Sequence, residues 1–254
     1  TIVRMIRKAI NVEMIILFGS YARGNAVEEL DEQGVYYRYQ SDFDILVIVD
    51  DRKLAKKWRV WERMKDDIRG SGLVKTPVSI ITENINGFNH QLKHGHYFYS
   101  DIQKEGVLLY NSGKYELAEA KELSPEERQQ KAKDNFEQWF ESAKEFFGYF
   151  QTGFKKGQYK SAAFLLHQTT ECFYSAILLV FTGYKPKTHD IEELGKKAAG
   201  QEPKFLQVFP KGTPEEKRLF DLLKRAYVEA RYNKKNYRIT HEELEWLAER
   251  MKIL

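Results

Sequence analysis

Two short stretches decide the fold of the first half of this chain: Phe18-Gly19-Ser20-Tyr21-Ala22-Arg23-Gly24 and Ser41-Asp42-Phe43-Asp44-Ile45-Leu46-Val47. Each adjoins an apolar run of strand character, Met14 to Phe18 and Ile45 to Val49. Because side chains alternate along a strand, Asp42 and Asp44 project from the same face. Two neighbouring carboxylates are hard oxygen ligands of the kind that Mg²⁺ prefers. The sequence therefore predicts a metal site on the second strand.

The Gly-Ser turn predicts a phosphate site beside that metal. Gly19 lets the backbone approach a phosphate without an intervening Cβ, and Ser20 is expected to open a helix whose free N–H groups favour anions. Both motifs thus indicate one ligand, a nucleoside triphosphate on Mg²⁺. The alternative is a helix N-cap serine that lies by chance beside an acidic strand end.

These residues resemble the polymerase-beta-type nucleotidyltransferase superfamily, whose signature is Gly-Ser, a spacer and Asp-x-Asp on a strand. GSYARG with SDFDILV is most similar to its minimal nucleotidyltransferase branch. The resemblance implies that Asp42 and Asp44 are catalytic and hold Mg²⁺, and that Gly19, Ser20 and Arg23 bind the nucleotide. It also implies transfer of a nucleoside monophosphate to a hydroxyl group, with release of pyrophosphate.

The sequence departs from this pattern in two places. The spacer from Tyr21 to Ser41 is unusually long and contains an insertion, expected to form a hairpin or flap, with Glu28, Glu29, Asp31, Glu32, Tyr36, Tyr37 and Tyr39. The family also places a third carboxylate on a later strand, where it completes the metal site and serves as general base. On the matching run, Val78-Ser79-Ile80-Ile81, the inward residue is Ser79, and Glu83 follows beyond the expected position.

Composition indicates a globular protein without a disulfide framework. The chain has 254 residues, a formal net charge of +4 and a single cysteine, Cys172, which we expect to be a buried small hydrophobe. The mild charge does not indicate a dedicated nucleic-acid binder. The longest apolar run, Ala176 to Phe181, is too short to span a bilayer. We therefore expect a cytoplasmic location and no membrane partner.

Pattern changes divide the chain into two domains of different class. Short apolar strands alternate with helices over residues 1–112, residues 113–127 are charged and linker-like, and residues 128–254 are helical. The predicted fold class is α+β, with a mixed sheet and flanking helices followed by an all-α helical bundle. We expect helices over Arg52–Arg69, Asn86–Gly95, Tyr159–Phe181, Asp190–Ala199, Pro214–Tyr232 and Thr240 onward, with one more after Ser124-Pro125.

The second half resembles the HEPN family, a helical bundle often fused to minimal nucleotidyltransferases. The resemblance rests on two long helices with His167-Gln168-x-x-Glu171 on the second, on Gly183-Tyr184-Lys185-Pro186-Lys187-Thr188-His189-Asp190, and on Glu229-Ala230-Arg231-Tyr232. From the spacing alone, His167 and Glu171 are read as a structural helix pair. His189 is read as a residue that orients the loop into the third helix.

Ribonuclease members of that family carry an arginine followed, after four to six residues, by a histidine. Here Arg231 is followed by Tyr232-Asn233-Lys234-Lys235-Asn236-Tyr237, and the histidine is missing. Without that imidazole, general acid–base cleavage of RNA loses its main agent. Arg231 and Tyr237 remain a candidate phosphate site, against the alternative of a solvated basic turn.

The sequence leaves the acceptor open. Family analogy indicates a protein tyrosine, as in toxin–antitoxin pairs, with Tyr232 or Tyr237 to inspect, or an RNA acceptor. The acidic insertion also suits the polycationic substrate of an aminoglycoside nucleotidyltransferase. A third reading is a catalytically degenerate, nucleotide-binding regulatory module. A homodimer through the helical domain is expected from the family alone.

Overall fold

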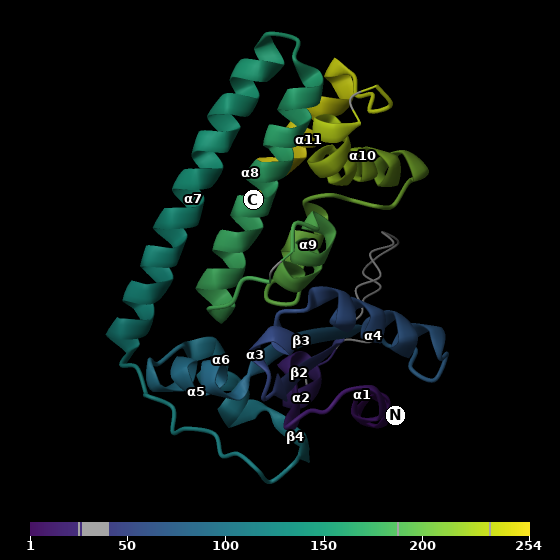
Figure 1. Ribbon diagram of the computed structural model, residues 1–254. Coiled ribbons are helices and arrows are strands. Elements are labelled where there is room, and N and C mark those ends of the chain that lie inside the picture. The colour runs from purple at the N-terminus through teal and green to yellow at the C-terminus, as the bar shows by residue number, and fades with distance from the viewer. Residues whose placement is uncertain (25, 27–40, 187, 234) are drawn as a thin grey trace. The chain divides into compact units, whose positions relative to one another are not determined.

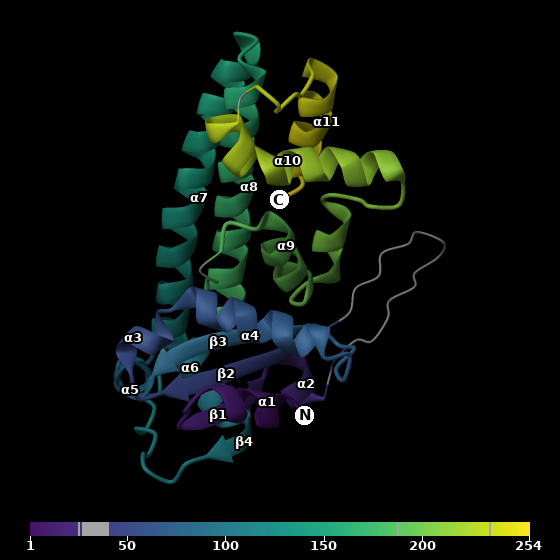
Figure 2. The same ribbon diagram turned by 45° about the vertical axis from the view of Figure 1, so that its right-hand side comes forward.

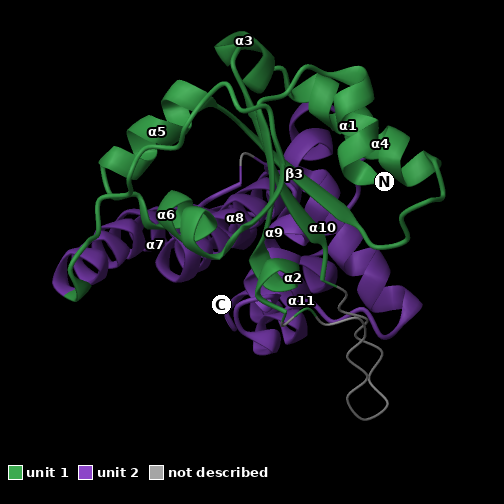
Figure 3. Cartoon of the chain, turned by 90° about the horizontal axis from the view of Figure 1, so that it is seen from below, with its two compact units in different colours: residues 1–30, 39–125 green, residues 31–38, 126–254 purple. Residues whose placement is uncertain are grey.

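The chain forms two compact units that meet in sequence between Pro125 and Glu126 (Figure 3). The structure is a computed structural model that describes residues 1–24, 26, 41–186, 188–233 and 235–254. The insertion predicted as a flap, with its acidic residues and tyrosines, therefore lies outside the described residues. The two units are described separately below.

A four-stranded mixed sheet is the centre of the first unit (Figure 1). Its strands are β1 (Met14–Phe18), β2 (Phe43–Val49), β3 (Val78–Asn84) and β4 (Val107–Asn111), in the order β3-β2-β1-β4. β1 runs antiparallel to β2 and β4, whereas β2 and β3 are parallel. Pro77, directly before β3, predicts an edge strand, and β3 is an edge of the sheet in the described chain.

Helices pack on both faces of this sheet. On one face, α1 (Ile2–Ala9) and α4 (Trp58–Gly70) share a core with alternate residues of β1 and β2. This core includes Ile6, Ile15, Ile45, Val47, Val49, Trp61, Met64 and Ile68. On the other face, α5 (Ile85–Lys93) and α6 (Tyr97–Glu105) contact the strands, and Phe98 meets Phe18 edge-on with ring centroids 5.8 Å apart. α3 (Arg52–Ala55) precedes α4, so the single helix expected over residues 52–69 is broken into two.

The segment after β4, expected to be a linker, is hydrogen-bonded to the first unit. Asn89 of α5 donates to the carbonyl of Glu116 and accepts from the N–H of Ala118, at 3.1 and 2.7 Å. Gln103 of α6 donates to the Ala118 carbonyl at 2.9 Å. The N–H of Lys121 donates to the Leu92 carbonyl at 3.0 Å. Residues 116–121 therefore lie along α5 and α6.

The second unit is helical, as expected for a bundle. Its elements are α7 (Pro125–Lys155), α8 (Tyr159–Thr182), α9 (Ile191–Ala199), the 3₁₀ helix η1 (Pro203–Gln207), α10 (Pro214–Tyr232) and α11 (His241–Met251). The long helices α7 and α8 run side by side, and α10 crosses α8 (Figures 1 and 2). Gly183 ends α8 in the left-handed conformation, with φ 68°. Capping boxes begin α10 at Thr213 and α11 at Thr240.

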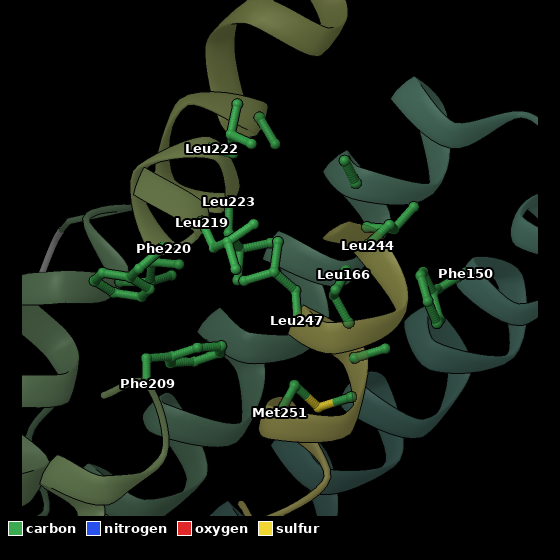
Figure 4. Close-up of a cluster of buried hydrophobic side chains, with 14 of the residues drawn as sticks. Phe150, Leu166, Phe209, Leu219, Phe220, Leu222, Leu223, Leu244, Leu247 and Met251 are labelled. Carbon is green, nitrogen blue, oxygen red and sulfur yellow. The ribbon is translucent and has the colours of Figure 1, made fainter. Parts of the chain in front are cut away.

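The core of the second unit is built where α8, α10 and α11 converge (Figure 4). Its members include Phe150, Leu166, Phe209, Leu219, Phe220, Leu223, Leu244, Leu247 and Met251. Among the described helices, α8 alone is long and apolar enough to cross a membrane by length and composition. Because 56% of its most apolar window is buried inside the protein, α8 has the character of a core helix.

Candidate functional site

The turn between β1 and α2 (Gly19–Arg23) brings Gly19 against the second aspartate. Gly19 has φ +74°, a left-handed conformation that favours glycine. A Cβ built on Gly19 would overlap Oδ2 of Asp44 and lie 3.2 Å from its Cγ. The carboxylate of Asp44 therefore packs directly on the bare backbone of the Gly-Ser turn.

Strand register explains this contact. Phe18, the residue before the turn, pairs with Asp44 across the antiparallel β1–β2 ladder. Tyr21 of α2 packs on Phe43, with ring centroids 4.3 Å apart, and so anchors the short helix beside the start of β2. α2 is little more than one turn long, so its dipole adds little to anion binding beyond the N–H groups of the turn.

Asp42 and Asp44 form the donor set of the candidate metal centre. Both side chains are half-buried, Asp42 directly before β2 and Asp44 as its second residue. Alternation along the chain directs the two carboxylates to one side. Half-buried carboxylate oxygens next to a turn without a side chain fit Mg²⁺ that keeps waters and phosphate oxygens as further ligands.

The third strand contributes a serine at the level of Asp44. Ser79 pairs with Asp44 in the parallel β2–β3 ladder, so both side chains project from the same face. Glu83 pairs with Ile48, four residues further along, where its carboxylate accepts from the N–H of Asn84 at 3.0 Å. No cluster of three or more His, Cys, Asp or Glu side chains that could hold a metal occurs in the described chain. The expectation that Ser79 replaces a third carboxylate thus agrees with the register.

Arg23, expected to bind the nucleotide, forms an ion pair within the first unit. Its guanidinium lies 3.6 Å from the carboxylate of Glu105, at the end of α6, and both side chains are about half exposed. An exposed pair of this kind contributes little stability. Arg23 is therefore able to exchange Glu105 for another anion at small cost.

In the second unit the structure separates Arg231 from Tyr237. Tyr237 is 1% exposed, and its hydroxyl donates to the Leu222 carbonyl at 3.0 Å, so it is a core residue closed to a phosphate. Arg231 is half-buried at the end of α10, and its Nε donates to the Tyr227 carbonyl at 2.6 Å. Tyr232, beside it, is 77% exposed.

A buried carboxylate in the second unit binds a histidine that the sequence did not pair with it. Glu171 of α8 is 4% exposed, and both of its carboxylate oxygens lie 3.0 Å from Nδ1 of His189. His167, which the sequence paired with Glu171, is buried, and burial lowers its pKa to about 4. His167 is therefore neutral near pH 7.

Cys172 is buried in α8, as expected. Burial raises the pKa of its thiol to about 11, with a smaller contribution from Glu171. Because the thiolate is the nucleophilic form, Cys172 is unreactive near neutral pH.

Comparison with protein families matches each unit separately. Residues 1–114 match the family described as polymerase beta, nucleotidyltransferase, and residues 136–254 match the HEPN domain. A search of curated proteins gave no match to the chain. The two family matches follow the order and approximate limits of the two units.

Proposed function

We propose that this chain, an N-terminal nucleotidyltransferase domain joined to a C-terminal HEPN domain, binds a nucleoside triphosphate on Mg²⁺ and transfers a nucleoside monophosphate to a hydroxyl group. The family match supports nucleotidyltransferase-type activity in general. The observation that carries the finer proposal is the packing of Asp44 on Gly19, because it puts a candidate metal ligand directly beside the backbone of the Gly-Ser turn.

The residues of the site have distinct tasks in this proposal. Asp42 and Asp44 supply carboxylate oxygens to Mg²⁺, which when bound neutralises charge on the phosphates. The N–H groups of Gly19 and Ser20 and the Ser20 hydroxyl donate to phosphate oxygens. Arg23 adds a positive charge when it leaves Glu105.

The reaction balances without a redox partner. The acceptor oxygen forms a bond to the α-phosphorus, the bond from that phosphorus to the bridging oxygen breaks, and pyrophosphate leaves. The acceptor hydroxyl loses its proton, which in this chain passes to water or to an oxygen of the substrate, because a serine hydroxyl such as that of Ser79 is a poor base.

Ser79 also supports a second candidate, a domain that binds the nucleotide as a regulatory ligand and does not transfer it. Two carboxylates suffice to hold Mg²⁺ with a triphosphate. A hydroxyl in place of the third leaves the acceptor without a general base. The two candidates share a ligand and differ in turnover.

For the acceptor, exposure distinguishes the two tyrosines considered from the sequence. Tyr232 is 77% exposed and Tyr237 is 1% exposed. If the acceptor is a tyrosine of a second, folded copy of this chain, Tyr232 is therefore the one of these two that the transferase could reach.

The decisive experiment is incubation of the purified chain with Mg²⁺ and each α-³²P-labelled nucleoside triphosphate, followed by gel and mass analysis. We expect label on the chain or on an added acceptor, lost in Asp44→Asn and retained in the control Asp66→Asn, which changes an exposed aspartate of α4. Label that persists in Asp44→Asn would refute the site. Mg²⁺-dependent binding without label would favour the regulatory candidate, and Ser79→Asp should then confer measurable transfer.

A further inference from the structure

The segment of α3 and the first turns of α4 concentrates positive charge that the chain as a whole lacks. Five of the eight residues 52–59 are basic and none is acidic, although the whole chain has 41 basic and 37 acidic residues. With one more arginine a turn later, they make six exposed cations without an ion pair in the part of the chain that the structure describes. We call this set the α3–α4 basic patch: Arg52, Lys53, Lys56, Lys57, Arg59 and Arg63.

The second half of α4 shows the opposite pattern. There Lys65 lies 2.6 Å from Glu62, and Arg69 lies 3.5 Å from Asp66. The first turn of α4 has no acidic residue, and its N-cap residue, Lys57, forms no side-chain cap. The helix dipole disfavours positive charge at this end of a helix. The stability of α4 therefore does not account for the cations at its start.

Trp58 puts an exposed indole ring among these cations. It is 66% exposed, and the guanidinium carbon of Arg59 lies 5.5 Å from its ring centroid. Trp61 and Met64 of the same helix are buried in the core of the first unit. Among residues 52–70, all of which the structure describes, Trp58 is the one large hydrophobic side chain that is exposed. The patch thus combines several cations with a single flat ring.

Hydrogen bonds fix the two helices of the patch on the sheet. The hydroxyl of Thr82, in β3, donates to the Ala55 carbonyl at the end of α3, at 2.8 Å. Nε1 of Trp61, in α4, donates to the Leu54 carbonyl at 3.0 Å and so ties α4 to α3. Because the backbone of the patch is already held in place, binding a ligand would order side chains only.

The patch begins at the end of β2 that lies away from the two aspartates. Asp44 is the second residue of β2, whereas α3 follows Val49, the last residue of the strand. At a rise of about 3.4 Å per residue, the two positions are roughly 17 Å apart. Figures 2 and 3 show α3 and α2 at opposite ends of the sheet. The patch is therefore a separate surface from the candidate metal centre.

We propose that the α3–α4 basic patch is a docking surface for single-stranded nucleic acid, with Trp58 as the ring on which a base stacks. Lysine and arginine side chains bind phosphates whatever the base sequence, and an exposed aromatic ring stacks with any base. The total charge of the chain does not reveal such a surface, because acidic residues elsewhere cancel it.

Two other anionic partners fit the patch less well. A lipid surface requires an apolar helix face that inserts between the headgroups. The apolar face of α4 is instead buried in the core, where Trp61 and Met64 pack. An acidic peptide would pair with the cations but would leave the indole of Trp58 without a partner. Nucleic acid uses both the charges and the ring.

The test measures the affinity of the full-length chain for fluorescein-labelled oligouridine and oligothymidine of about 12 nucleotides, by fluorescence anisotropy. The chain carries Asp44→Asn and is kept in EDTA without nucleotide, so that the proposed transferase site does not contribute. We expect both oligomers to bind, with an affinity that falls as salt is added. For a single strand, the slope of log affinity against log salt is about −0.7 for each phosphate neutralised.

Variants separate the charges from the ring. The double variant Lys56→Gln with Lys57→Gln removes two phosphate contacts and should make the slope smaller by about 1.4. Trp58→Ala removes stacking and no charge, so it should weaken binding about fivefold or more and leave the slope unchanged. Trp58→Phe keeps a ring and should bind close to wild type. Tighter binding of oligouridine than of oligothymidine would add the 2′-hydroxyl to the contacts of the surface.

The matched control is Lys65→Gln with Arg69→Gln, which removes two positive charges from the second half of the same helix and should leave the slope unchanged. An equal loss of slope in the two double variants would overturn the proposal, as would wild-type affinity in Trp58→Ala. Tighter binding of polyglutamate or of phosphatidylserine vesicles than of either oligomer would assign the patch to an acidic peptide or to a membrane. Urea unfolding identifies any variant that does not fold. Because the test is made with Asp44→Asn in EDTA, its failure leaves the proposed transferase site untouched.

Discussion

Replacing Gly19 by alanine should weaken nucleotide binding through a defined steric clash. The left-handed backbone at φ +74° costs a residue with a Cβ about 1–2 kcal/mol. In addition, the new methyl group would overlap the Asp44 carboxylate and lie 3.2 Å from its Cγ. Since the atoms that the new methyl group meets all belong to the Asp44 side chain, we expect the carboxylate to move. Mg²⁺–nucleotide affinity should then fall about tenfold or more, equivalent to about 1.4 kcal/mol.

Gly24 provides a matched control for the backbone term. It has φ +72°, and a Cβ built on it meets nothing within 4 Å. Gly24→Ala should therefore lower the free energy of unfolding by the same 1–2 kcal/mol, approximately, yet leave ligand affinity unchanged.

Urea unfolding and isothermal titration with Mg²⁺–ATP and a non-hydrolysable analogue measure the two effects. Binding by Gly19→Ala at wild-type affinity would refute the contact between the turn and Asp44 as the basis of the site. Equal loss of affinity in both variants would show that backbone strain, and not the carboxylate, is responsible.

Two further predictions concern the second unit. Burial alone would raise the pKa of Glu192, but hydrogen bonds from Lys211 and Lys224 lower it from 4.5 to about 2. The folded state thus binds fewer protons than the unfolded state between those values, so stability is lost as pH falls from about 4.5 to 2. The difference in the free energy of unfolding between wild type and Glu192→Gln, at most about 3.4 kcal/mol before solvent screening, should close over that range in urea unfolding. A difference that does not depend on pH would contradict the assignment. Tyr237→Phe should lower the free energy of unfolding by about 1 kcal/mol, because it removes the hydrogen bond to Leu222 and no packing volume; an unchanged urea midpoint would argue against that bond.

The sequence predicted most of the sheet and nearly all of the bundle because periodicity and end signals agreed there. The strand at Met14–Phe18 and the helix at Pro214–Tyr232 have the predicted limits. One continuous helix over residues 52–69 would put Trp58 on an inward stripe with Trp61, Met64 and Ile68, but Trp58 is 66% exposed at the start of α4. The break at Lys56 and Lys57 changes the phase of that stripe, and periodicity alone does not reveal such a break.

The candidate site was predictable where it depends on strand register. Alternation put Asp42 and Asp44 together and identified Ser79 as the inward residue of β3. The partner of Arg23 was not predictable, since Glu105 belongs to α6, a helix that sequence patterns did not indicate. Nor was the pairing of His189 with Glu171, because their contact spans 17 intervening residues and depends on how the α8–α9 loop folds back.

The hydrogen bonds that hold residues 116–121 on α5 and α6 bear on how the first unit could be produced alone. A fragment that ends at Asn111 or Ser112, where the strand pattern stops, would lack the backbone partners of Asn89 and Gln103. It would also expose the surfaces of α5 and α6 that residues 116–121 cover. Such a fragment would tend to aggregate during expression. A protease, conversely, would find few cleavable bonds within residues 116–121, since cleavage requires several residues in extended form without hydrogen bonds to the rest of the protein. A fragment meant to contain the whole first unit should therefore end at Pro125, the last residue of that unit.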